Sequence, residues 1–112
     1  MKNPVLFALL GEVILVKTLE QIKQDLETVK RYYAHKDEFE QAFQSGKCLQ
    51  IQKLVNEYEE AILLAPSKFY DVYCAIYQRG LTQEACAIEL GYTSRYIQSL
   101  LKLMTFHLLN TF

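Results

Sequence analysis

Seven polar residues close to the C-terminus could take part in chemistry, and their spacing indicates what kind. Arg95, Gln98, Ser99 and Lys102 follow one another at the intervals of neighbours on one side of an α-helix. A guanidinium can bind guanine through two hydrogen bonds and a carboxamide can bind adenine likewise, while hydroxyls suit phosphates or base edges. We therefore expect recognition through hydrogen bonds and positive charge, with candidate site residues Thr93, Ser94, Arg95, Tyr96, Gln98, Ser99 and Lys102.

Two short predicted helices that meet at a glycine would position these residues. Thr82 can cap the first helix, and Gly91 follows it where a left-handed conformation is needed. Thr93 can cap the second helix, in which Tyr96 could either reach a nucleic-acid backbone or pack as a core aromatic. The opposite face of this second helix carries apolar residues toward a core, namely Ile97, Leu100, Leu101 and Met104.

The spacing of this segment is typical of a helix-turn-helix. Counted from Gln83, the fifth place holds the small Ala87, the eighth and ninth hold Leu90-Gly91, and the fifteenth and eighteenth hold Ile97 and Leu100. The segment resembles the helix-turn-helix of sigma-factor region four and of sigma-like regulators carried by bacteriophages. The resemblance covers roughly the last third to half of the chain. It implies a DNA-binding transcriptional regulator of phage or bacterial type, with the helix at 94–105 as recognition helix.

The charge of the C-terminal part keeps a second function open. From Pro66 onward there are four basic residues and three acidic ones, a margin of one positive charge. Because phosphate contacts supply most non-specific affinity for DNA, so few charges predict weak binding by a monomer. The alternative is a protein-binding helix-turn-helix module that inhibits or recruits RNA polymerase or another host or phage protein. Convergence of Arg79, Arg95 and Lys102 on one exposed face would favour DNA.

The composition predicts an all-α fold. The chain has 112 residues, of which 51% are hydrophobic, and only four glycines and two prolines occur, at places where helices should begin or end. We expect a small helical bundle with a long N-terminal helix and a C-terminal tri-helical helix-turn-helix unit. We divide it into an N-terminal helical and dimerisation segment, 1–47, and a helix-turn-helix domain, 48–112.

The N-terminal apolar stretches allow two structures. Residues 5–10 and 13–16 are almost wholly apolar and are separated by Gly11 and Glu12. We expect a helix here, but the β-branched residues of 13–16 leave open a β-hairpin that turns at Gly11-Glu12. The run is shorter than the about 20 apolar residues of a membrane span, and no small-residue cleavage site follows it, so we expect no membrane contact.

A heptad-like pattern follows. Its apolar residues are spaced alternately by four and three, and they are Leu15, Leu19, Ile22, Leu26, Val29 and Tyr33. This seam could form a coiled coil in a homodimer, or it could be the inner face of an ordinary amphipathic helix. Residues 103–109 are apolar nearly all round, which predicts a helix that is buried or paired.

Residues typical of catalysis or metal binding do not form a recognisable motif. His35 and His107 belong to no nucleophile or acid/base pattern, and there is no glycine-rich phosphate loop. Cys48, Cys74 and Cys86 are scattered, as expected of buried thiols in a reducing compartment. We expect a cytoplasmic protein that is not an enzyme and uses no metal or cofactor.

Overall fold

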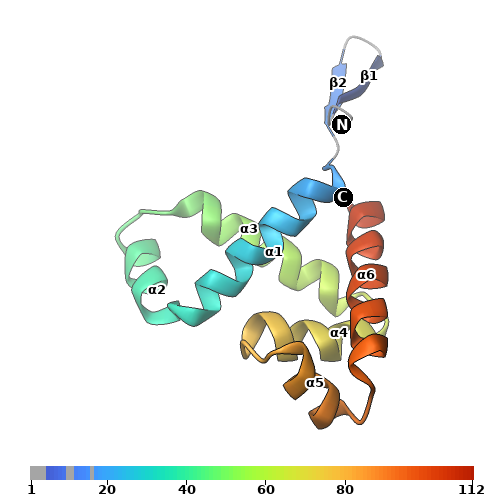
Figure 1. The fold of residues 1–112 in the computed structure, drawn as a ribbon. Helices are drawn as coiled ribbons and strands as arrows, with labels where there is room; N and C mark the ends of the chain where they lie inside the picture. The colour runs from blue at the N-terminus through green and yellow to red at the C-terminus, as the bar shows by residue number, and fades with distance from the viewer. Residues whose placement is uncertain (1–4, 10–11, 16) are drawn as a thin grey trace.

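A computed structural model describes residues 5–9, 12–15 and 17–112, and it describes side chains from residue 17 onward. Residues 17–112 are helical, which confirms the expected all-α class (Figure 1). The elements are α1 (Leu19–Ala34), α2 (Lys36–Gln44), α3 (Leu49–Leu63), α4 (Ser67–Tyr73) with its π-helical continuation η1 (Cys74–Gln78), α5 (Gln83–Leu90) and α6 (Ser94–Thr111).

The apolar N-terminal stretches form two strands, so the expected helix at this place was wrong and the hairpin alternative holds. Strand β1 (Val5–Leu9) pairs antiparallel with β2 (Glu12–Leu15). The register places Leu9 opposite Glu12 and Ala8 opposite Val13, with an irregularity between Val5 and Ala8. Valine and isoleucine have restricted χ1 angles and favour strands over helices. This preference is consistent with strands at a place where we expected a helix. Gly11, where the turn was predicted, lies outside the described residues.

The seam of α1 is the inner face of an amphipathic helix. Ile22, Leu26 and Val29 are at most 2% exposed, and they pack in one core cluster with Tyr58 of α3 and Met104 of α6. Burial of such side chains stabilises the fold by roughly 1.5–3 kcal/mol each. Because these seam residues are covered by their own chain, they are not accessible for a coiled coil with a second copy. The cluster contains residues of both predicted parts of the chain, 1–47 and 48–112, and these residues pack against one another.

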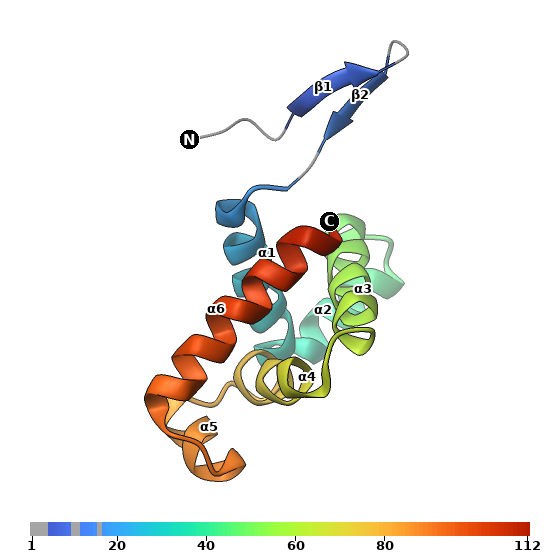
Figure 2. The ribbon, with the colours of Figure 1, turned by 90° about the vertical axis from the view of Figure 1, so that its right-hand side faces the viewer.

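A second core cluster joins the C-terminal helices. Cys86 and Ala87 of α5 and Ile97 and Leu100 of α6 pack on Val72, Ala75 and Ile76 of α4 and η1. Helix α6 belongs to both clusters, because Met104 and Leu108 lie in the first one. Figure 2 shows α6 extending from α5 along the bundle toward the C-terminus. The long α6 therefore fixes the α5 end of the molecule to α1 and α3.

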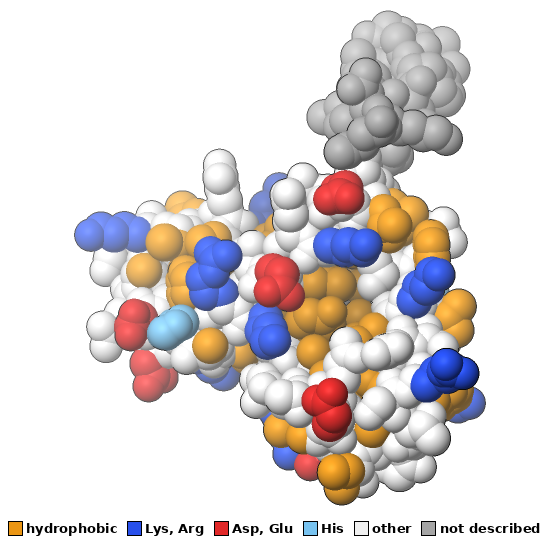
Figure 3. All heavy atoms as spheres, viewed as in Figure 1, with side chains coloured by type: hydrophobic (Ala, Val, Ile, Leu, Met, Phe, Trp, Pro, Cys, Tyr) orange, Lys and Arg blue, Asp and Glu red, His pale blue; other side chains and the backbone are white. Residues whose placement is uncertain are grey.

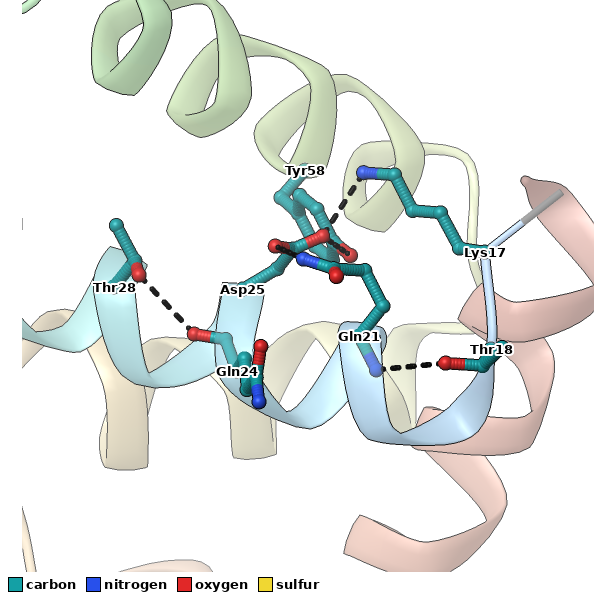
Figure 4. A network of polar contacts seen from close by, with 7 residues as sticks. All are labelled: Lys17, Thr18, Gln21, Gln24, Asp25, Thr28 and Tyr58. Atoms are coloured by element: carbon teal, nitrogen blue, oxygen red, sulfur yellow. Dashed lines mark hydrogen bonds and ion pairs between the residues drawn. The ribbon is translucent and has the colours of Figure 1, made fainter. Parts of the chain in front are cut away.

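A buried carboxylate ties the start of α1 to α3 (Figure 4). Asp25, which is 4% exposed, accepts hydrogen bonds from the Tyr58 hydroxyl at 2.6 Å, Lys17 Nζ at 2.9 Å and Gln21 Nε2 at 2.8 Å. Lys17 Nζ also lies 4.7 Å from the ring centroid of Tyr58 and 4.3 Å from that of Phe112. The buried charge is thus paired and hydrogen-bonded, as a charge removed from water must be.

None of the helices in the described part of the chain has both the length and the apolar character that crossing a bilayer requires.

Candidate nucleic-acid interface

Both ends of the turn between α5 and α6 are set by local hydrogen bonding. Thr82 Oγ1 accepts from the Ala85 backbone N–H at 3.1 Å and so caps α5, as predicted. Gly91 ends this helix with a φ of 75°, and Thr93 Oγ1 caps α6 by accepting from the Tyr96 N–H at 3.1 Å. Each cap satisfies a backbone donor that lacks a partner within its own helix. The hydroxyl of Thr93 therefore already has a structural function.

The buried faces of α5 and α6 are those that the sequence predicted. Ala87 is 4% exposed, and its small side chain allows close approach of the two helices. Ile97, Leu100 and Met104 are at most 3% exposed, while Leu101 is half-buried. Because α6 has 3.6 residues per turn, burial of this side directs the opposite side to solvent.

Four predicted site residues share that exposed side of α6. Arg95, Gln98, Ser99 and Lys102 are all exposed, and Arg95 and Lys102 are two helical turns apart, about 10 Å along the axis. Among the described residues, neither of these two cations is paired with a carboxylate. The result is an exposed stripe of two cations, a carboxamide and a hydroxyl, which begins in the first turn of a helix.

The other predicted site residues lie at the margin of this stripe. Ser94 is half-buried as the first residue of α6. Tyr96 is half-buried against the second core cluster, its ring lies edge-on to Tyr92 at 4.7 Å, and its hydroxyl accepts from Lys68 Nζ at 3.4 Å. These contacts make Tyr96 chiefly a packing residue, which was one of its two predicted roles.

Arg79 does not add its charge to the stripe in the expected way. Its guanidinium forms a two-pronged ion pair with Glu89 of α5, with Nη2 2.8 Å from Oε1. The hydrogen bond from Arg79 lowers the pKa of Glu89 below its ordinary value. Of the three cations whose convergence would favour DNA, two are exposed and unpaired among the described residues, namely Arg95 and Lys102.

An apolar surface that the sequence analysis missed continues the stripe toward the C-terminus. Leu103 and Phe106 are 56% and 42% exposed, so they are not buried within this chain, while the alternative that this helix is paired with a partner stays a prediction. Phe106 and Leu101 line a groove of about 420 Å³ against Leu19 and Lys23 of α1. Figure 3 shows apolar side chains in this space, with charged side chains of both signs beside them. Phe106 is eleven residues from Arg95, which is close to three full helical turns, so the two residues lie on the same side of α6. This spacing could have been used to predict the apolar surface from the sequence.

The described part of the chain holds no group of metal ligands, and two of its three thiols are shielded from solvent. No three His, Cys, Asp or Glu side chains there are grouped as ligands for a metal ion. Cys86 is buried and Cys74 half-buried, and burial raises the pKa of both thiols. Cys48 is exposed, which corrects the expectation that all three thiols are buried.

Comparison with known proteins assigns no family. No protein-family model, curated protein or solved structure matches this chain. The resemblance to sigma-factor region four therefore rests on the amino-acid sequence of the C-terminal part of the chain alone and stays a prediction.

Proposed function

We propose that this protein binds duplex DNA through a helix-turn-helix made of α5 and α6, as a phage or bacterial transcriptional regulator in the cytoplasm. In this motif the N-terminal part of the second helix enters the major groove. The observation that supports the proposal best is the exposed stripe of Arg95, Gln98, Ser99 and Lys102. It lies opposite the buried Ile97 and Leu100, on the part of α6 that would face the groove.

Each residue of the stripe has a distinct proposed role. Arg95 and Gln98, in the first two turns of α6, read base edges, for which guanidinium and carboxamide groups are suited. Lys102 and Ser99 contact phosphates, and Thr93 and Ser94 lie where the helix N-terminus approaches the backbone. Two cations give only a small electrostatic contribution, so specific contacts must supply a large share of the affinity.

Selection of binding sites from a randomised duplex pool tests these roles. If Arg95 reads a base, Arg95→Ala should cost about 1–3 kcal/mol at the selected site and relax preference at one base pair. Lys102→Ala should weaken binding to all sequences by a similar factor, since phosphates are the same at every site. The control is Lys53→Ala, an exposed cation of α3 outside the motif. If the Arg95→Ala variant keeps the full base preference of the natural chain at every position of the selected site, Arg95 does not read a base.

A protein partner is the second candidate, and the exposed Leu103 and Phe106 favour it. Large apolar side chains that continue a recognition face are typical of protein–protein contacts. The partner would be RNA polymerase or another host or phage protein. A Leu103→Ser, Phe106→Ser variant that loses partner binding in vitro but keeps its fold would support this function. If the variant loses DNA binding alone, the apolar surface belongs to the DNA interface.

We also propose a homodimer, because two copies would double the contacts that one copy makes with DNA. The buried seam of α1 cannot form its interface, so another surface must. Sedimentation equilibrium of the protein with and without its selected DNA would measure the stoichiometry. One copy per site at saturation would contradict a dimer.

A further inference from the structure

A cavity of about 460 Å³ lies between α1, α2 and α3, in a part of the molecule that contributes nothing to the stripe on α6. Tyr32 of α1, Phe43 of α2 and Val55 of α3 supply its apolar surface. The rings of Tyr32 and Phe43 are stacked, with centroids 5.8 Å apart and planes inclined by 15°. The volume falls within the range of small-molecule sites, which combine apolar walls with a few polar groups.

The described lining of the cavity contains one carboxylate, and its charge is negative. Gln44, Gln52 and Asn56 contribute carboxamides and Glu40 contributes a carboxylate, and among the described residues no lysine, arginine or histidine lines the cavity. The carboxylate and carboxamide oxygens accept hydrogen bonds, while the carboxamide NH2 groups can also donate. The Tyr32 hydroxyl donates to Glu40 Oε2 at 3.3 Å, which leaves the other carboxylate oxygen for a ligand. An anionic ligand would meet the charge of Glu40, and the part of the lining that the structure describes offers no cation to compensate it.

We propose that this cavity binds a small organic cation, an amine whose ammonium group is held by Glu40 and the neighbouring carboxamides. The hydrocarbon or aromatic part of the amine lies against Phe43 and Val55. An ammonium near the Tyr32 and Phe43 rings also gains from their negative faces. The proposal does not depend on DNA binding, because none of these residues belongs to α5 or α6.

The packing of α2 gives binding a measurable consequence. Helix α2 has no buried residue and is held mainly by Phe39 and Phe43 against Tyr32. A ligand that contacts Glu40 on α2 and Gln52 on α3 at once joins the two helices. Since it binds the folded state alone, it should slow amide exchange in α2 and raise the unfolding temperature.

The test compares three probes of similar shape by NMR titration of the full chain at neutral pH: phenethylammonium, 2-phenylethanol and 3-phenylpropionate. We expect the cation to shift amides at 40–44 and 52–56 and to bind at least fivefold more tightly than the alcohol. The anion should produce no such shifts. Equal binding of cation and alcohol, shifts elsewhere in the chain, or no shifts at all would overturn the proposal.

Two variants locate the charge that matters. Glu40→Gln should remove the preference for the cation over the alcohol, because it replaces the carboxylate with a neutral group of the same shape. Asp37→Asn, which removes an exposed carboxylate on the same helix but outside the cavity lining, should retain the preference. If both variants lose it equally, the cation is responding to the general charge of α2, and the cavity is not its site.

Discussion

The guanidinium of Arg79 and the carboxylate of Glu89 form a two-pronged ion pair that joins the end of η1 to α5. Both side chains are near the motif, and Glu89 cancels most of the charge that Arg79 could offer to a phosphate. The electrostatics of the proposed interface therefore depend on Arg95 and Lys102, which are exposed on one side of α6.

Arg79→Ala is expected to leave the salt dependence of DNA binding almost unchanged. The slope of log affinity against log salt decreases in magnitude by about 0.9 for each phosphate that the protein no longer neutralises, and a paired Arg79 neutralises none. Lys102→Ala should lower the magnitude of the slope by about that amount. Fluorescence anisotropy on a mixed-sequence duplex measures both variants. An equal decrease in the two would show that Arg79 leaves Glu89 to contact DNA.

Asp25→Ala is expected to destabilise the protein by about 3 kcal/mol, because it leaves Lys17 and the buried hydroxyl of Tyr58 without their acceptor. Tyr58→Phe should cost about 1.5 kcal/mol, since Asp25 keeps two other donors. Glu27→Ala, an exposed change on the same helix, should stay within about 0.5 kcal/mol. Urea unfolding followed by circular dichroism gives all three values. Equal stability of Asp25→Ala and Glu27→Ala would mean that the network contributes nothing.

Gly91→Val is expected to cost about 2 kcal/mol through backbone strain alone. The φ of 75° disfavours a β-branched residue, yet a Cβ at this position would meet no atom within 4 Å. Gly91→Asn should cost less, because asparagine tolerates the left-handed region. Gly46→Val, with φ +77° in the loop between α2 and α3, is the matched control. Both valine variants should lose similar stability in urea, but Gly91→Val alone should weaken DNA binding.

Alkaline pH is expected to unfold the protein through its buried tyrosines. Burial raises the pKa of Tyr58 and Tyr73 above the ordinary 10.0, and it raises the pKa of Tyr77 to about 12. The unfolded chain therefore releases these protons first, so stability is complete below about pH 10 and decreases as pH rises toward the raised values. Tyr77→Phe should move the alkaline midpoint to higher pH. Phenolate absorbance and far-ultraviolet circular dichroism should change together, and full ionisation before unfolding would contradict this prediction.

Local patterns in the sequence predicted the helices and the ends of the proposed motif well. Thr82, Gly91 and Thr93 interact only with residues that are near them in the sequence. The capping hydrogen bonds and the positive φ of Gly91 therefore follow from residue type and position. Burial of Ile97 and Leu100 follows from helical period in the same way. The all-α class followed from such patterns added along the chain.

Relationships between distant residues could not be read from the sequence. The pairing of Arg79 with Glu89 and the burial of Asp25 beneath Tyr58 depend on how helices pack. The apolar spacing of α1 is the same in a coiled coil with a second copy and in a helix that packs on its own chain. The fold distinguishes these alternatives, because it buries the apolar residues within the chain. The prediction of a helix within 5–16 was wrong for the described residues 5–9 and 12–15, because short apolar segments suit helix and strand almost equally.

The most direct test of DNA binding through α6 is affinity for mixed-sequence duplex DNA across a salt series, for the natural chain and an Arg95→Ala, Lys102→Ala double variant. Binding should weaken as salt rises, and the log–log slope of the double variant should be smaller in magnitude by about 0.9, because the variant loses the phosphate contact of Lys102. The absence of binding even at low salt, or an unchanged slope in the double variant, would contradict contact through this face of α6.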